Sequence, residues 1–318
     1  IRDRSPSRGL GDVYKRQESE ICKELLFFRS STIIYLYLYY AVTVKRDGCL
    51  PVLKGVEIMR ISLIQFSVVP GDRDANFEQA RRHVQTAASD GADVAVLSEL
   101  WDTSFYPSDI REKADEEGAL ARAFLQDLAK EYHIHLVGGS IARRHEDGIY
   151  NTTYIVDRDG ALVSSYDKCH LFTPGKEDKA FTAGRDLNVF SLDGVTMASI
   201  ICYDVRFSEW VRMAALAGAK VLFVPAAWPE ERLEHWRLLN RARAIENQFF
   251  VAAVNSCGTC GRLTFGGHSL LADPQGNVLI EGGSDDAVLT ETIDLSVVDD
   301  IRSRINVFRD RRPELYHL

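Results

Sequence analysis

The chain contains the stretch Val195-Thr-Met-Ala-Ser-Ile-Ile201, followed directly by Cys202-Tyr-Asp-Val-Arg-Phe207. The first segment is short and mostly apolar, which is typical of an interior strand in a sheet that is covered on both faces. Residues 207–217 carry apolar side chains at helical spacing, and Gly218 is a common signal for the end of a helix. The sequence therefore predicts that Cys202 lies at a corner between a strand and a helix.

A thiol at such a corner has its side chain exposed at the edge of the sheet. Backbone N–H groups at the start of the following helix face the thiol, lower its pKa and can bind an oxyanion. The alternative is a buried structural cysteine, since free cysteine is among the most buried residue types. Position alone leaves both interpretations of Cys202 open.

The composition narrows the class of protein. The 318 residues are 46% hydrophobic, so the chain can bury a substantial core. With 38 basic and 46 acidic residues, the net charge of −8 gives no basic footprint for nucleic acid or for an anionic membrane. The six cysteines have no regular spacing and so indicate no disulfide framework. We therefore expect a cytoplasmic protein.

Residues 1–58 differ in character from the rest of the chain. The first 17 residues resemble translated adapter DNA, so we expect Met59 to be the natural start and residues 1–58 to be a non-native or disordered extension. Residues 30–44 hold no charged side chain, but this stretch is shorter than the about 20 residues that a membrane-spanning helix needs. The sequence thus predicts a domain at residues 59–318 with no membrane anchor.

Within that domain, strand and helix patterns alternate. The predicted strands are residues 60–69, 94–97, 135–141, 151–157, 161–166, 195–201, 221–224, 249–255, 269–271 and 278–281. The predicted helices are residues 74–89, 116–132, 207–217 and 231–247, with Asp74 or Asn76 as the cap of the first. Turn sequences at residues 158–160 and 273–276 predict hairpins, so part of the sheet is antiparallel. The pattern favours one mixed α/β domain.

Three residues with catalytic potential, namely Glu99, Lys168 and Cys202, each follow a predicted strand. A thiol has an unperturbed pKa of about 8.5 and needs a base to become a nucleophile at neutral pH. A carboxylate can take that proton, and a lysine can stabilise the negative oxygen that forms when a carbonyl is attacked. Together the three groups suit acyl transfer from an amide or nitrile. Glutamate and lysine are also common on surfaces, so spacing alone leaves a structural interpretation open.

Three motifs around these residues carry a family resemblance: Ser98-Glu99-Leu100-Trp101, Tyr166-Asp-Lys168-Cys-His-Leu-Phe172 and Cys202-Tyr-Asp-Val-Arg206-Phe207. In their residues and their order they resemble the catalytic signatures of the carbon–nitrogen hydrolase, or nitrilase-like, superfamily. The resemblance covers residues 59–316. It implies a four-layer α-β-β-α sandwich with mixed sheets that assembles as a homodimer or larger homo-oligomer.

The same resemblance implies a role for each site residue, with no metal and no cofactor. Glu99 is the expected general base, Cys202 the nucleophile and Lys168 the oxyanion stabiliser, assisted by the Tyr203 backbone N–H. Glu177, which precedes Phe181-Thr-Ala-Gly184, matches the family's second glutamate and is expected to position Lys168 and the substrate. The alternative for Glu177 is a solvated charge in a polar run.

Three further stretches, at residues 225–229, 241–248 and 307–316, look like those of the bacterial ω-amidases. That branch hydrolyses the side-chain amide of 2-oxoglutaramate or 2-oxosuccinamate. The resemblance implies that Trp228 and Phe105 line the acyl pocket. The counter-ion for the substrate carboxylate is not identified from the sequence: Arg206 is a candidate by position, but we expect it to form a structural ion pair with an acidic neighbour.

Other functions remain as alternatives. Within the same fold, the substrate can be a nitrile, an N-carbamoyl amino acid or another aliphatic amide, and a remote alternative is a non-catalytic dimerising module. The pair Cys257-Gly-Thr-Cys260 has no second pair, so zinc and redox functions are not expected. The glycines around it form no phosphate loop, and we expect a flexible loop at residues 257–267. His268 and Ser269 lack the elbow motif of serine hydrolases. The sequence favours a cofactor-independent cysteine amidohydrolase.

Overall fold

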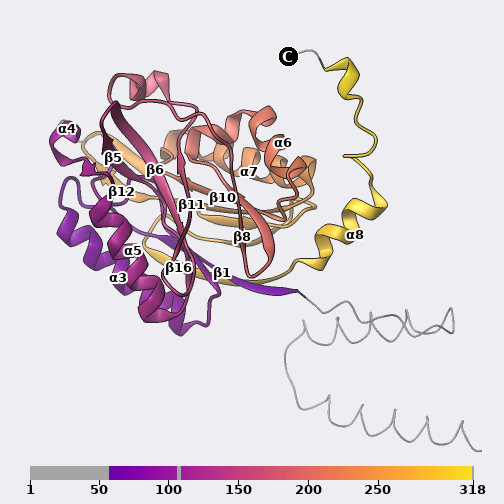
Figure 1. Cartoon of the computed structure of the whole chain (residues 1–318), viewed down its shortest axis with the longest axis horizontal. Coiled ribbons are helices and arrows are strands. Elements are labelled where there is room, and N and C mark those ends of the chain that lie inside the picture. The colour runs from indigo at the N-terminus through magenta and orange to yellow at the C-terminus, as the bar shows by residue number, and fades with distance from the viewer. Residues whose placement is uncertain (1–56, 106–108, 317–318) are drawn as a thin grey trace, which may run out of the picture. The chain divides into compact units, whose positions relative to one another are not determined.

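The computed structural model describes residues 57–105 and 109–316 (Figure 1). The predicted extension at residues 1–58 lies outside this part of the chain except for its last two residues, and it stays a prediction, as does the interpretation of residues 30–44. Within the described part, no helix combines the length and the apolar character needed to cross a bilayer.

Two mixed sheets form the centre of the domain. The larger sheet contains eight strands, in the order β16 (Ala287–Asp294), β1 (Ile58–Gln65), β2 (Val94–Val96), β4 (His135–Val137), β6 (Gly148–Val156), β5 (Ile141–His145) and β3 (Asp115–Glu116), with β7 (Leu162–Asp167) also paired to β6. The smaller sheet contains six strands, in the order β15 (Val278–Glu281), β14 (Leu270–Ala272), β11 (Phe250–Asn255), β10 (Val221–Ala226), β9 (Val195–Ser199) and β8 (Asn188–Leu192).

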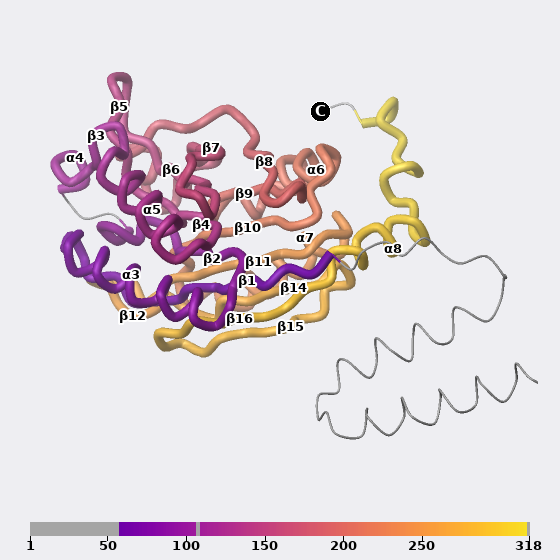
Figure 2. Tube along the Cα trace, turned by 60° about the horizontal axis from the view of Figure 1, so that its bottom comes forward, coloured from indigo at the N-terminus to yellow at the C-terminus, as the bar shows by residue number. Residues whose placement is uncertain are grey.

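Helices cover the outer face of each sheet. Helices α3 (Arg73–Ser89) and α5 (Ala119–Tyr132) pack on the larger sheet, and α6 (Ser208–Leu216) and α7 (Leu233–Asn247) pack on the smaller one (Figures 1 and 2). The remaining helices are short: α4 (Ile110–Lys113), α8 (Ser296–Arg304) and the 3₁₀ turns η1 (Thr173–Gly175), η2 (Glu177–Lys179), η3 (Cys202–Arg206), η4 (Glu230–Arg232) and η5 (Pro313–Leu315). The predicted four-layer α-β-β-α sandwich is confirmed.

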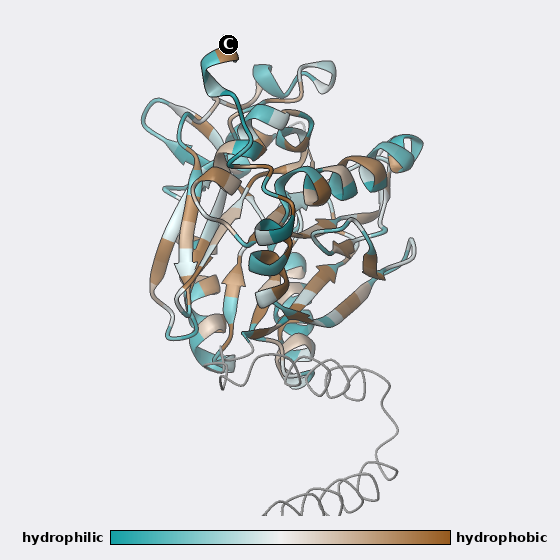
Figure 3. Cartoon of the chain, turned by 90° about the vertical axis from the view of Figure 1, so that its right-hand side faces the viewer, coloured by the Kyte–Doolittle hydropathy of each residue, from teal (hydrophilic) through white to brown (hydrophobic). Residues whose placement is uncertain are grey.

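The alternation of side chains along the strands explains the layers. In β10, Val221 and Phe223 point into the core between the two sheets, whereas Leu222 and Val224 point toward α6 and α7. Strand β11 shows the same alternation, so these two interior strands of the smaller sheet are apolar on both faces. Burying each such side chain contributes about 1.5–3 kcal/mol. Accordingly, Figure 3 shows hydrophobic colouring along many of the strands and hydrophilic colouring on outward parts of the helices.

The sequence pattern does not predict strand β16. This strand pairs with β1 along its whole length, from Ile58 opposite Asp294 to Gln65 opposite Ala287. It lies at the edge of the larger sheet and is mostly half-buried. An edge strand of this kind carries polar and acidic side chains, so it lacks the continuous apolar run by which the interior strands are recognised.

Several local predictions are wrong. Residues 257–267 do not form a simple flexible loop, because β12 (Cys257–Cys260) and β13 (Leu263–Gly266) make an antiparallel hairpin. Gly258 has a φ of +76°, and a Cβ there would lie 2.1 Å from the Ser67 hydroxyl oxygen, so this glycine permits close packing. The cap of α3 is Asp72, whose side chain accepts a hydrogen bond from the Ala75 N–H.

Candidate active site

Glu99, Lys168 and Cys202 come from three different strands. Glu99 lies just beyond the end of β2, Lys168 follows β7 directly, and Cys202 opens η3 shortly after β9. Lys168 Nζ donates a hydrogen bond of 2.7 Å to Glu99 Oε1, and both side chains are fully buried. The structure thus brings together the glutamate and the lysine that the sequence singles out.

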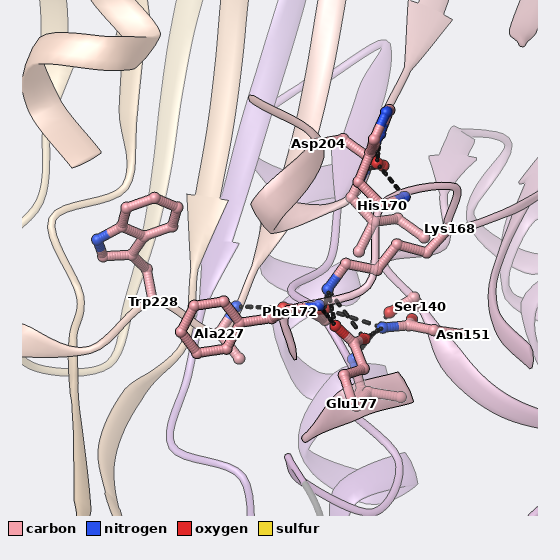
Figure 4. Close-up of polar contacts among 12 residues, drawn as sticks. Ser140, Asn151, Lys168, His170, Phe172, Glu177, Asp204, Ala227 and Trp228 are labelled. Carbon is pink, nitrogen blue, oxygen red and sulfur yellow. Dashed lines mark hydrogen bonds and ion pairs between the residues drawn. The ribbon is translucent and has the colours of Figure 1, made fainter. Parts of the chain in front are cut away.

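Glu177 completes a buried cluster of charges. Lys168 Nζ lies 3.0 and 2.9 Å from the two carboxylate oxygens of Glu177 (Figure 4). With its bond to Glu99, the ammonium is therefore paired with two carboxylates. Glu177 Oε2 also accepts a 2.6 Å hydrogen bond from the Phe172 backbone N–H. Glu177 is therefore no solvated surface charge but a direct partner of Lys168.

The charges in this cluster shift one another's pKa values. Burial lowers the pKa of Lys168, but the negative charges of Glu177 and Glu99 outweigh it and hold that pKa well above its usual value. Burial raises the pKa of Glu177, the Lys168 charge lowers it, and the Glu99 charge raises it, so the net shift is upward. Lys168 consequently keeps its positive charge at neutral pH.

Asn151 is a member of the site that the sequence analysis missed. Its Nδ2 donates hydrogen bonds to Glu99 Oε1 at 2.9 Å and to Glu177 Oε1 at 3.1 Å. A neutral donor between two carboxylates reduces their repulsion and fixes their separation. The sequence gives only a weak signal for Asn151, because it is a single uncharged amide side chain at the start of a predicted strand.

Cys202 occupies an unusual backbone position, and its thiol differs from the expectation. Its φ is +47°, in the left-handed region that residues with a side chain seldom adopt. The side chain is buried, not exposed. Burial and the charge of Glu99 raise the pKa of the thiol well above its usual value, although Lys168 opposes this. The prediction of a lowered pKa is wrong because burial and the Glu99 charge outweigh the Lys168 charge.

Cys202 lies on the wall of a cavity of about 260 Å³. The lining residues come mainly from the loops after β7, β9 and β10 and from the β12–β13 hairpin: Phe105, Phe172, Pro174, Gly175, Cys202, Tyr203, Arg206, Ala227, Trp228, Pro229, Glu231, Arg232, Leu263 and Phe265. The cavity wall includes Phe105, Tyr203 and Trp228, to which the family resemblance assigns substrate binding. Since the lining is largely aromatic and apolar, the cavity suits a small organic molecule.

The loop after β10 places two backbone N–H donors, those of Ala227 and Trp228, at the cavity wall. The Ala227 N–H donates a 2.9 Å hydrogen bond to Glu99 Oε2, and the Trp228 N–H donates one of 2.6 Å to Asn255 Oδ1. Glu99 is thereby tied to the smaller sheet as well as to its own. As the second residue of η3, Tyr203 has a backbone N–H in the first turn, which finds no acceptor within its own helix.

Arg206 differs from its predicted structural role. Within residues 57–105 and 109–316, no carboxylate forms an ion pair with its guanidinium. The guanidinium carbon instead lies 4.7 Å from the centre of the Trp228 ring and 6.0 Å from that of Tyr203, on the cavity wall. Burial lowers its pKa, but arginine remains charged. A positive charge is therefore available to a ligand.

Asp102 lies three residues after Glu99 and is fully buried. Its Oδ2 lies 3.3 Å from Arg73 Nη2, and Thr103 donates a 3.3 Å hydrogen bond to its Oδ1. Burial raises the pKa of Asp102 to about 6, against the opposing effect of Arg73. The protonation of Asp102, in the loop that carries Glu99, therefore changes near pH 6 in the folded protein.

Comparison with known proteins agrees with this geometry. Residues 60–303 match the family described as carbon-nitrogen hydrolase. The chain belongs to the carbon–nitrogen hydrolase family. It is therefore a hydrolase that acts on carbon–nitrogen bonds other than peptide bonds. Among curated relatives of this carbon–nitrogen hydrolase, the 2-oxoglutaramate amidase of Bacillus subtilis (strain 168) is 43% identical over 256 residues, which cover 80% of this chain and 98% of the relative.

Solved structures agree with the fold of this carbon–nitrogen hydrolase. XC1258 of Xanthomonas campestris, a superfamily protein with an arsenic adduct in its active site, has a TM-score of 0.77 at 30% identity, covering 82% of this chain and 99% of that protein. A mutant amidase of Nesterenkonia sp. AN1, with the acetamide moiety of fluoroacetamide added covalently at the active-site cysteine, has a TM-score of 0.73 at 30% identity, covering 85% and 98%.

The raised pKa of Asp102 predicts how stability varies with pH. The folded state keeps the proton up to about pH 6, whereas the unfolded chain releases it near its ordinary value of 3.8. Because the folded state binds more protons in this window, the free energy of unfolding due to Asp102 falls as pH rises, by up to about 3 kcal/mol. Asp102→Asn cannot ionise, so its stability relative to wild type should rise between pH 4 and 6.

The measurement is urea unfolding of both proteins at several pH values from 4 to 7. Subtracting the two profiles removes the contributions of all other titrating groups. Parallel profiles for wild type and Asp102→Asn would show that Asp102 has the same pKa in the folded and unfolded states.

Proposed function

We propose that this carbon–nitrogen hydrolase cleaves the terminal amide of a small 2-oxo acid, such as 2-oxoglutaramate, through a thioester on Cys202 with release of ammonia. The observation that carries the proposal is the cavity: it joins the thiol of Cys202, beside the buried Glu99–Lys168–Glu177 cluster, to a guanidinium that no carboxylate neutralises in the described part of the chain. The 2-oxoglutaramate amidase of Bacillus subtilis supplies the choice of amide.

In the first half of the reaction, Glu99 takes the proton of the Cys202 thiol and the sulfur attacks the amide carbon. The raised pKa of the thiol means that the nucleophile rests protonated and is activated only as the substrate reacts. Lys168 Nζ and the Tyr203 backbone N–H stabilise the oxyanion. Glu99 then passes its proton to the leaving nitrogen, the C–N bond breaks, and ammonia departs from the acyl thioester.

In the second half of the reaction, a water molecule enters after ammonia has left and hydrolyses the thioester. Glu99 removes a proton from the water as its oxygen attacks the thioester carbon, and Lys168 again stabilises the oxyanion. The C–S bond then breaks, and Glu99 returns its proton to the sulfur. The net reaction converts an amide and water into a carboxylic acid and ammonia, and no cofactor takes part. Glu177 and Asn151 hold Lys168 and Glu99 in place throughout.

The substrate assignment depends on Arg206. A 2-oxo acid amide carries a carboxylate at the end opposite the reacting amide, and a planar guanidinium can bind a carboxylate through two parallel hydrogen bonds. Stacking on Trp228 holds the Arg206 guanidinium at the cavity wall. Nitriles, N-carbamoyl amino acids and simple aliphatic amides remain the rival substrates within the fold.

We also propose that the chain works as a homodimer that pairs through α6. Met213 and Leu216 on this helix are 48% and 45% exposed, and Leu315 and Tyr316 at the end of the chain are 59% and 50% exposed. All four line one groove between α6 and the C-terminal segment. Exposed apolar side chains gathered at one groove support pairing with another protein surface.

A reducing compartment such as the cytoplasm suits this enzyme. The cysteines of residues 57–316 are all free thiols, including the proposed nucleophile. An oxidising compartment would expose Cys202 to loss of the thiol that the reaction needs.

Cys202→Ala should abolish ammonia release from 2-oxoglutaramate, with a loss of about 10⁴-fold or more, because no other group supplies the nucleophile. The unfolding midpoint in urea should stay near that of wild type. Wild-type enzyme quenched during turnover should carry the acyl mass on the peptide that contains Cys202. Turnover by a folded Cys202→Ala variant would rule out the thioester mechanism, and an inactive wild type would favour the non-catalytic module.

Arg206→Met should raise the KM for 2-oxoglutaramate about 100-fold, because a charge-assisted contact is lost, while the kcat/KM for butanamide should change less than threefold. Arg232→Met is the matched control, since Arg232 also lines the cavity but is already paired with Glu231. A panel of 2-oxoglutaramate, glutamine, a nitrile and an N-carbamoyl amino acid should rank 2-oxoglutaramate first. An equal effect of Arg206→Met on both amides would remove the carboxylate assignment.

Met213→Glu and Leu216→Glu should each convert the dimer to a monomer, because a charge would be buried in the α6 interface. Sedimentation velocity measures the change in mass. Leu120→Glu is the control, since Leu120 is 58% exposed on α5, in the opposite helix layer. A wild-type monomer, or a dimer that survives both α6 substitutions, would refute pairing through this helix.

A further inference from the structure

A further buried carboxylate lies close to the site without belonging to its charge cluster. Asp204, in the turn η3, is fully buried and accepts four hydrogen bonds. Its Oδ2 accepts from the Ile201 N–H at 2.9 Å and from the Tyr166 hydroxyl at 2.7 Å. Its Oδ1 accepts from the His170 backbone N–H at 2.9 Å and from His170 Nδ1 at 2.7 Å. The four donors satisfy this carboxylate in the absence of bulk water.

The donors to Asp204 belong to two segments of the chain, one around Lys168 and one next to Cys202. Tyr166 and His170 stand two residues before and two residues after Lys168, so Asp204 holds the lysine segment on both sides. Ile201 directly precedes Cys202. One carboxylate therefore joins the segment that carries the ammonium to the turn that carries the thiol. Figure 4 shows Asp204 bonded to His170 on one side of Lys168, with the Lys168 ammonium extending toward Glu177 and Asn151.

The turn that Asp204 holds is a strained one. With a φ of +47°, Cys202 adopts a conformation that costs a residue with a side chain about 1–2 kcal/mol. Such strain persists only where surrounding contacts enforce it. Asp204 supplies two of these contacts, because its side chain accepts from the Ile201 N–H and its own N–H donates to the Ile201 carbonyl oxygen at 3.0 Å. Ile201 and Asp204 thus clamp the turn on either side of Cys202.

The hydrogen-bond network around Asp204, which we call the brace, continues into helix α6. The Tyr166 hydroxyl accepts hydrogen bonds from Trp210 Nε1 at 3.2 Å and from the Cys169 N–H at 3.3 Å. The His170 ring stacks on Phe207, with 3.8 Å between ring centres and 14° between ring planes. The lysine segment, the cysteine turn and the start of α6 are therefore fixed relative to one another through contacts that converge on Asp204.

We propose that Asp204 is a positioning residue for amide hydrolysis: by binding both segments, it fixes the distance and direction between the Lys168 ammonium and the Cys202 sulfur. Asp204 acts through Lys168 and Cys202, and it is absent from the residues that line the cavity. This inference rests on the proposed thioester mechanism. A displacement of about 1 Å between reacting groups can cost 10²-fold in rate, so the precision of this brace bears directly on turnover.

Asp204→Asn tests the proposal, because an amide offers one acceptor oxygen while its NH₂ group confronts two of the four donors. The variant should lose about 100-fold in kcat for 2-oxoglutaramate, while KM should change less than threefold, since the cavity wall keeps its residues. Alkylation of Cys202 by iodoacetamide at pH 8, followed by peptide mass mapping, should slow about tenfold because the thiolate loses its aligned ammonium.

Two further variants make the result decisive. Asp115→Asn is the matched control: Asp115 is also buried, and its two oxygens accept from the Leu120 and Ala121 N–H groups at the start of α5. It should lower the unfolding midpoint yet leave kcat and the alkylation rate within twofold of wild type. Tyr166→Phe removes one donor to Asp204, should cost about tenfold in kcat, and carries the test if Asp204→Asn does not fold.

The outcomes separate this proposal from the proposed function. The positioning role of Asp204 is supported if Asp204→Asn loses both kcat and alkylation rate while Asp115→Asn retains them. It is overturned if a folded Asp204→Asn keeps either readout within twofold of wild type, or if Asp115→Asn loses as much. Tyr166→Phe is judged by the same criteria only if Asp204→Asn does not fold. If wild type hydrolyses none of the amides, the proposed function fails, and the alkylation rates still decide whether Asp204 positions Cys202.

Discussion

The buried ammonium of Lys168 is the interaction on which the rest of the site depends. A lysine with no exposure to solvent is tolerated only when it is paired and hydrogen-bonded, and here two carboxylates share that task. Each carboxylate is held by a backbone N–H from a different segment, Phe172 for Glu177 and Ala227 for Glu99. Removing one partner would leave a buried charge uncompensated, so the groups to which we assign the chemistry are also structurally necessary.

The two sheets contribute different parts of this arrangement. The larger sheet presents Glu99 and Lys168 at the ends of β2 and β7, whereas the smaller sheet presents Cys202 and the Ala227 N–H after β9 and β10. The proposed base, Glu99, and the proposed nucleophile, Cys202, therefore meet only where the sheets pack face to face. The packing of the apolar core between the sheets therefore sets how Glu99 and Cys202 lie relative to each other.

Much of the architecture could be predicted from the sequence, because interior strands with apolar runs and amphipathic helices have distinct periods. Glu99, Lys168 and Cys202 could be found because each follows such a strand, and the family motifs then gave their order a meaning. Asn151 could not be found, since its importance lies in two hydrogen bonds to carboxylates from distant segments. Arg206 was assigned a structural ion pair because sequence does not reveal whether an acidic partner lies nearby. Strand β16 was missed because a half-buried edge strand has no apolar run.

The pairing of β1 with β16 has a consequence for how the protein is made. These strands are the first and the last of the domain, and they lie side by side in register along eight residue pairs. On the ribosome, β1 leaves the exit tunnel long before its partner is synthesised, so its edge stays open while the rest of the sheet assembles. Completion of the larger sheet must wait for nearly the whole chain. A nascent chain that stalls before residue 287 therefore presents an unpaired strand edge, which is a site for pairing with another chain.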